Sequence, residues 1–166
     1  LDIQPPVQRP PSLKEAIERR RGRAIITEVK YSSPSLGSLR CSSDDPVEIA
    51  RDMLRGGASG ISVLAEPNIF NGSVENVYRI SNELCAPTLF KDIIVSMEQI
   101  TVAYRVGASA VLLIMRLFDD GYCEKGLESM VRYSYELGLE VVLETHGRRE
   151  FEEALTMDCE VIGINN

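Results

Sequence analysis

Charged side chains recur where the apolar segments of this chain end, at the points where a β-strand would pass into a loop. Glu28 and Lys30 end the first of these segments, Lys91 ends a later one and Glu144 ends another. A lysine ammonium group can donate a proton or hold an anion, and a carboxylate can orient that lysine or accept a proton. Gathered around one cavity, these residues would suit acid–base chemistry on an anionic substrate. The competing interpretation is a set of structural ion pairs, because such networks also carry perturbed pKa values.

The apolar segments themselves have the composition of parallel β-strands. They are rich in β-branched residues and lack strict alternation with polar residues, as strands covered on both faces do. Their starts lie roughly 20 to 37 residues apart, which is the length that a strand–helix–strand unit requires. The predicted strands are 24–30, 61–66, 87–92, 110–115, 139–144 and 161–165.

Helix start and stop signals fill the intervals between these strands. Asp45 followed by Pro46 predicts one helix start, the capping box 96–99 predicts another, and Ser12 begins a short helix near the N-terminus. Regular alternation of strand and helix argues for a parallel α/β architecture, and no nucleotide-binding fingerprint or P-loop follows the first strand. We therefore predict an α/β fold of the TIM (β/α)8 barrel type, with about six of the eight β/α units present.

The predicted domains are a leader with a short helix over residues 1–22 and a barrel domain over residues 23–166, with the C-terminal units absent. In such a barrel the carboxyl ends of the strands meet at one mouth. Side chains two residues apart in a strand point the same way, so Glu28 and Lys30 can both face inward. The strand ends and the loops just after them hold Glu28, Lys30, Glu66, Lys91, Asp92, Arg116, Glu144, His146 and Asn165.

Two further features lie near this mouth. The hydroxyl-rich loop 31–38 follows the first predicted strand, and such a loop either offers donors to an anion or forms a plain surface turn. His146 is the single histidine and has no serine or cysteine partner at a matching strand end, so a hydrogen-bonding role at the rim is favoured. Elsewhere, the run of three arginines at 19–21 is interpreted as a solvated helix face.

Composition argues against several kinds of partner. The formal net charge is −7 and the pI is about 4.8, so no nucleic acid is expected as a partner. No apolar run approaches the ~20 residues that span a bilayer, so no membrane partner is expected. The four cysteines are scattered without a C-x-x-C pair, which favours neither a zinc site nor a redox dithiol. We expect a cytoplasmic protein with reduced thiols and no metal.

Six sequence motifs follow one another from the first predicted strand to the last residue. They are E-V-K-Y-S-S-P-S, I-S-V-L-A-E-P-N-I-F-N-G-S, L-F-K-D-I-I, G-A-S-A-V-L-L-I, V-V-L-E-T-H and I-G-I-N-N. Together these motifs resemble the indole-3-glycerol phosphate synthase family of tryptophan biosynthesis, in the family's order and over about five sixths of the chain. The resemblance implies a β/α barrel with an N-terminal helical extension that helps to cover the mouth, of which this chain keeps little.

The resemblance also implies an activity, that of a carboxy-lyase of class EC 4.1.1.48. Its members convert the phosphorylated small molecule 1-(2-carboxyphenylamino)-1-deoxyribulose 5-phosphate to indole-3-glycerol phosphate by ring closure, decarboxylation and dehydration, without a cofactor. By this resemblance Lys91 is the general acid, Lys30 is the second catalytic lysine and Glu144 is the general base. Glu28 is similar to the carboxylate that positions the lysines. The implied substrate-binding residues are Ser33 at the phosphate, Pro34 beside it, Phe70 on the anthranilate ring and Asn165 as a hydrogen-bonding group.

Two departures from the family's pattern leave alternatives open. Ile93 stands where members commonly have phenylalanine, and the segments after strands 7 and 8 that build most of the phosphate pocket are absent. One alternative is therefore a catalytically inactive barrel fragment that self-associates through the open edges of its first and last strands. The other is a different phosphosugar-acting barrel such as phosphoribosylanthranilate isomerase, which the pairing of E-V-K with L-F-K-D disfavours.

Overall fold

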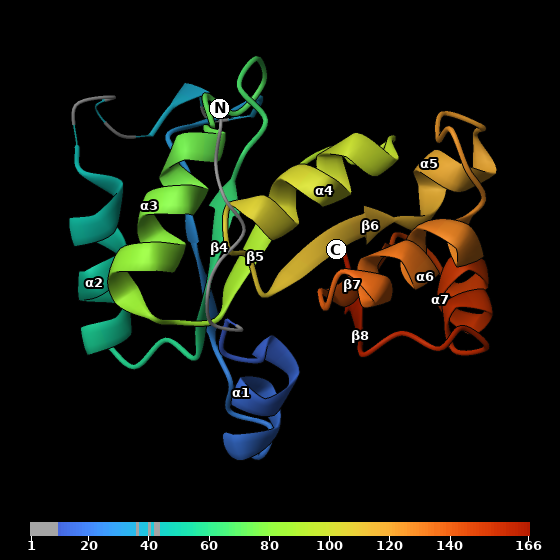
Figure 1. Cartoon of the computed structure of the whole chain (residues 1–166), viewed down its shortest axis with the longest axis horizontal. Coiled ribbons are helices and arrows are strands. Elements are labelled where there is room, and N and C mark those ends of the chain that lie inside the picture. Colours follow the sequence, from blue (N-terminus) through green and yellow to red (C-terminus); the bar gives the residue numbers. More distant parts are fainter. Residues whose placement is uncertain (1–9, 36, 40, 42–43) are drawn as a thin grey trace.

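A curved sheet of six parallel strands organises the chain (Figure 1). The computed structural model describes residues 10–35, 37–39, 41 and 44–166. The strands lie in the sheet in the same order as in the sequence, and each pairs in parallel with the next. Their bounds are β1 Ile26–Val29, β4 Gly60–Leu64, β5 Thr88–Lys91, β6 Ala110–Ile114, β7 Glu140–Thr145 and β8 Val161–Ile164. Sequential parallel strands with helical crossovers form a partial TIM barrel, which confirms the predicted fold class.

Helices connect the successive strands of this sheet (Figure 1). Their bounds are α2 Pro46–Arg55, α3 Val74–Leu84, α4 Met97–Arg105, α5 Met115–Asp119, α6 Leu127–Glu136 and α7 Arg148–Ala154. As predicted, the Asp45 side chain caps α2, and Ser96 and Gln99 form a capping box on α4. These local signals therefore define where the crossovers between strands begin.

The main hydrophobic core lies between the sheet and the crossover helices. Ile61, Val63 and Leu113 of the central strands are fully buried in it. Leu89 and Leu112 alternate with such residues along their strands and belong to a second, smaller cluster on the inner face of the sheet. Because the central strands, such as β4 and β6, are covered on both faces, they appear in the sequence as continuous apolar runs without polar alternation.

Helix α1 (Leu13–Arg19) closes the inner face at the amino ends of the strands. Leu13 is 1% exposed and packs in the inner cluster, where a Cβ on Gly60 would lie only 2.8 Å from its Cδ1. Glu140 at the start of β7 accepts hydrogen bonds from the backbone N–H groups of Leu13 at 2.8 Å and Lys14 at 3.0 Å. The Glu140 carboxylate of β7 thus satisfies two backbone N–H groups that the first turn of α1 would otherwise leave unpaired. Helix α1 therefore lies opposite the mouth, unlike the covering extension that the family resemblance implies.

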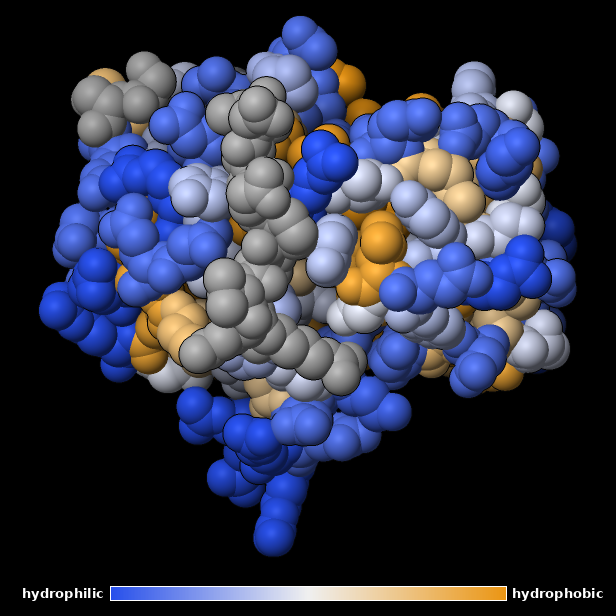
Figure 2. Space-filling model, in the orientation of Figure 1, coloured by the Kyte–Doolittle hydropathy of each residue, from blue (hydrophilic) through white to orange (hydrophobic). Residues whose placement is uncertain are grey.

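The outward surface of α1 and the turn after it is hydrophilic (Figure 2). The arginines at 19–21 are solvated there, as predicted, but only Arg19 belongs to the helix, because Arg20 is its C-cap and Arg21 lies in the turn that follows. Residues 1–9 of the predicted leader lie outside the described residues, as does residue 36 of the loop 31–38. The division of the chain at residue 22 stays a prediction.

Two segments differ from the predicted elements. The strand predicted over 110–115 ends at Ile114, and α5 begins at Met115 without an intervening loop. Arg116 therefore lies on a helix in place of the predicted strand end or loop. Its side chain is 62% exposed and pairs with Asp120 at 3.2 Å, and it does not line the cavity described below. An apolar run does not reveal where strand passes into helix. The predicted loop 31–38 contains a small hairpin formed by β2 (Ser32–Ser33) and β3 (Gly37–Ser38).

The described residues also bear on partners and metals. No helix among them is long and apolar enough to cross a membrane. Among the same described residues, no group of three or more His, Cys, Asp or Glu side chains could hold a metal ion. Strands β1 and β8 form the two edges of the six-stranded sheet, as the sequence predicted.

Candidate active site

A cavity of about 520 Å³ opens at the carboxyl ends of the strands. Every residue predicted as catalytic or substrate-binding lines it: Glu28, Lys30, Ser33, Pro34, Phe70, Lys91, Glu144 and Asn165. The parallel sheet explains this gathering, because the carboxyl ends of its strands meet on one side. The other lining residues are Ser35, Leu64, Glu66, Asp92, Ile93, Leu112 and Ile114. Among these, the sequence singled out Glu66 and Asp92 only as charges at strand ends. It gave no signal that distinguishes the apolar lining residues Leu64, Leu112 and Ile114 from residues of the core.

Glu28 joins the two lysines of the cavity. Its carboxylate oxygens lie 2.7 Å from Lys30 Nζ and 3.2 Å from Lys91 Nζ. Ser62 pairs with Glu28 in the register and donates a hydrogen bond to it at 3.4 Å, and its small side chain leaves room for Glu28 to reach Lys91 across β4. Desolvation raises the pKa of Glu28, but the hydrogen bonds and charges of the two lysines outweigh it and hold the pKa below its usual value. Two ammonium groups share one carboxylate, so Glu28, Lys30 and Lys91 together carry a formal charge of +1.

Glu144 and Asn165 form a second polar group in the cavity wall. Glu144 lies near the end of β7, and its side chain is 13% exposed. Asn165 follows β8 and donates from Nδ2 to Glu144 Oε1 at 3.0 Å. The backbone N–H of Asn165 also donates to the carbonyl of Thr145 at 2.8 Å, which ties the segment after β8 to the end of β7. The Glu144 carboxylate is therefore oriented by Asn165, which follows the neighbouring strand β8.

Glu66 organises the loop that carries Phe70. Its carboxylate is 8% exposed and accepts hydrogen bonds from the backbone N–H groups of Asn68 at 2.8 Å, Ile69 at 2.6 Å and Phe70 at 3.1 Å. Burial raises the pKa of Glu66, but these three donors, together with the Asn68 side chain, outweigh it and lower the pKa overall. The carbonyl of Phe70 in turn accepts a hydrogen bond from Ser32 at 3.2 Å. The loops after β1 and β4 are thereby held together beside the cavity.

We expect Glu66→Ala to loosen this loop. The substitution leaves three backbone N–H groups without their acceptor, so amide hydrogen exchange at Asn68, Ile69 and Phe70 should accelerate about tenfold or more. Glu75→Ala is the matched control, because it removes a carboxylate from an exposed position on the next helix. Unchanged exchange at the three amides of Glu66→Ala would mean that other contacts hold the loop.

Asp92 lines the same cavity but serves local structure. Its carboxylate accepts hydrogen bonds from the backbone N–H of Ile93 at 2.8 Å and from Gln99 Nε2 at 3.2 Å. Burial raises the pKa of Asp92 more than these donors lower it, and the charge of Glu66 acts in the same direction as burial. Since Gln99 belongs to the capping box of α4, Asp92 fixes the segment after Lys91 to that helix.

The curved parallel sheet, with a polar cavity at the carboxyl ends of its strands, defines the chain as a TIM-barrel protein. The fold is similar to that of a glycerophosphodiester phosphodiesterase from Agrobacterium tumefaciens, with a TM-score of 0.50 and 18% sequence identity over 93% of this chain and 58% of that one. The family model of indole-3-glycerol phosphate synthase matches residues 3–166, and the chain belongs to that family.

Individual relatives support the family assignment. The chain is 41% identical over 169 aligned residues to an indole-3-glycerol phosphate synthase of Methanocaldococcus jannaschii, covering all of this chain and 61% of that protein. It is 40% identical to the synthase of Lactococcus lactis over 86% of this chain and 53% of the relative. For the synthase of Thermococcus kodakarensis the identity is 40% over 93% of this chain and 65% of the relative. The chain thus spans about half to two thirds of the length of these relatives.

Proposed function

We propose that this chain supplies the acid–base part of an indole-3-glycerol phosphate synthase active site. The substrate is 1-(2-carboxyphenylamino)-1-deoxyribulose 5-phosphate, which loses carbon dioxide and water as the indole ring forms. The observation that carries this proposal is the bridge from Glu28 to both Lys30 and Lys91 in a cavity that Glu144 also lines. Family membership and a cavity volume within the range of small-molecule sites support it.

Ring closure needs a proton donor at the ketose oxygen, because the attacking aromatic carbon is a weak nucleophile. Lys91 donates this proton while Glu28 holds its ammonium group in place. The new carbon–carbon bond leaves positive charge on the ring, and loss of the carboxylate as carbon dioxide removes that charge. Lys30 holds the anionic groups of the substrate through these steps, aided by the excess positive charge of the lysine pair.

Dehydration then makes the new five-membered ring aromatic and completes the indole. In this step Glu144 accepts the ring proton, and Lys30 assists departure of the hydroxyl group as water. Phe70 packs on the anthranilate ring, and Asn165 hydrogen bonds the sugar chain. Ser33 contacts the phosphate, and Pro34 shapes the loop beside it.

The proposal is tested by mixing the substrate with the full-length protein that carries this sequence and following indole fluorescence. Formation of indoleglycerol phosphate and release of carbon dioxide in equal amounts are expected. No product at any enzyme concentration would contradict the proposal. Turnover of phosphoribosylanthranilate in its place would support the isomerase alternative.

A second candidate function rests on the sheet edges. Strands β1 and β8 each pair on one side only within the six-stranded sheet, so their other sides offer backbone groups to another strand. The candidate is a non-catalytic unit of these 166 residues that associates through those edges. Gel filtration and the fluorescence assay on this chain test it. A dimer without turnover supports it, and an active monomer rejects it.

A further inference from the structure

We propose that His146 is a positioning residue that accepts the second amide proton of Asn165 and so helps to hold Asn165 against the Glu144 carboxylate. This inference rests on the proposed function, in which Glu144 accepts a proton and Asn165 binds the substrate. His146 does not line the cavity itself, so it acts through these two neighbours.

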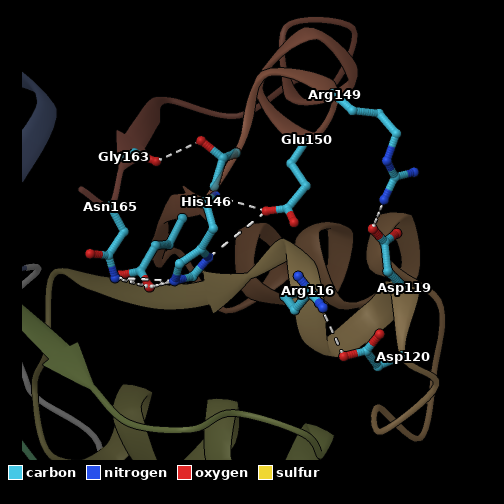
Figure 3. A network of polar contacts seen from close by, with 10 residues as sticks. Arg116, Asp119, Asp120, His146, Arg149, Glu150, Gly163 and Asn165 are labelled. Carbon is cyan, nitrogen blue, oxygen red and sulfur yellow. Dashed lines mark hydrogen bonds and ion pairs between the residues drawn. The ribbon is translucent and has the colours of Figure 1, made fainter.

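Three polar atoms meet at this point. Asn165 Nδ2 lies 3.0 Å from Glu144 Oε1 and 3.2 Å from His146 Nε2, and the imidazole nitrogen lies 3.3 Å from the same carboxylate oxygen. A side-chain amide nitrogen carries two protons, so Asn165 can donate one to each acceptor. In that arrangement the amide oxygen of Asn165 turns away from His146, as Figure 3 shows. That oxygen is then available to accept a hydrogen bond from a substrate hydroxyl group.

The other side of the imidazole ring indicates which tautomer allows this arrangement. His146 Nδ1 faces Glu150 Oε2 at 3.8 Å, and the same carboxylate oxygen accepts a hydrogen bond from the backbone N–H of His146 at 2.8 Å (Figure 3). Glu150 is buried in the first turn of α7, where it also places a carboxylate at the positive end of the helix. A neutral imidazole with its proton on Nδ1 directs that proton towards Glu150. Its Nε2 then remains an acceptor for Asn165.

The opposite tautomer gives a different arrangement. A proton on Nε2 would point at the Asn165 and Glu144 atoms and would oppose the amide N–H. Asn165 would then keep its hydrogen bond to Glu144 Oε1 but would lose the acceptor for its second amide proton. The structure therefore assigns to His146 Nε2 the role of second acceptor for the Asn165 amide, beside Glu144.

The tautomer can be measured without turnover, because the chain has a single histidine. The ¹⁵N chemical shifts of its ring at neutral pH should show a protonated Nδ1 and an unprotonated Nε2. An Nε2-protonated ring would overturn the proposal. Because this measurement uses the unsubstituted protein, it does not depend on the folding of any variant.

A double-mutant cycle tests the link to Asn165 in the full-length protein. His146→Leu should lower kcat/KM about fivefold to tenfold, whereas in the Asn165→Ala background the same change should have less than about a twofold effect. His146→Gln should retain most activity, since its amide oxygen can accept the Asn165 proton. Equal effects of His146→Leu in both backgrounds would overturn the link. A wild-type protein without turnover would instead contradict the proposed function, so the two failures are distinguishable.

Discussion

Lys91→Ala is expected to lower kcat of the full-length protein by roughly 10²- to 10⁴-fold, which is the usual contribution of a general acid or base. Lys91 ends β5 at the cavity, and Glu28 holds its ammonium group at 3.2 Å. In the proposed reaction, alanine cannot donate the proton that the ketose oxygen needs in the transition state. Substrate affinity should change much less, because the loss concerns an interaction made chiefly in the transition state.

The measurement is a kcat and KM determination by indole fluorescence. Once chemistry is slow in Lys91→Ala, KM reports substrate affinity directly. Lys14→Ala is the matched control, because Lys14 is exposed on α1 at the opposite end of the barrel. Equal kcat values for wild type and Lys91→Ala would refute the role of proton donor while leaving the family assignment intact.

Glu28→Gln is expected to have the second largest effect, a fall in kcat of about 10²-fold. The carboxylate contacts both lysines, and its neutral replacement leaves the two ammonium groups without their shared counterion. Their mutual repulsion then moves Lys91 away from the position where it donates. Glu18→Gln on the exposed surface of α1 is the control, since it makes the same chemical change away from the cavity.

The same variant distinguishes catalysis from the structural ion pairs that the charged residues could also represent. The pKa of Glu28 is lowered from 4.5, so its ionised form stabilises the folded state fully above about pH 4.5. That contribution is lost as the pH falls below 4.5 through the lower folded-state pKa. The stability difference between wild type and Glu28→Gln should therefore shrink in this acidic range, as urea unfolding at pH 7 to 3 would show. A difference that stays constant with pH would contradict the ion-pair geometry, and a stability loss with unchanged kcat would support the purely structural interpretation.

Local patterns explain why much of the fold was predictable. Runs such as 61–66 have the composition of strands covered on both faces, and the capping residues Asp45 and Ser96 mark the starts of α2 and α4. These signals involve residues close together in the sequence, so they are visible without tertiary information. The boundary between β6 and α5 was not predictable in this way, because Met115 is apolar in either element.

The sequence by itself determined the order of the strands, the starts of α1, α2 and α4, and the gathering of the charged residues at one mouth. The reason is that parallel strands with helical crossovers bring their carboxyl ends to the same side. Only the tertiary structure decided how these residues pair there. It showed that Glu28 is shared by two lysines, that Glu66 holds the backbone before Phe70 and that His146 lies against Asn165.

The position of α1 was likewise decided by the tertiary structure. The N-capping Ser12 predicted the helix. The position of the helix depends on the hydrogen bond from Leu13 to Glu140, which lies 127 positions further along the chain. Such contacts follow from sheet curvature, strand register and the room that Gly60 leaves for Leu13. No pattern among neighbouring residues encodes these quantities, because they arise only when distant segments pack together.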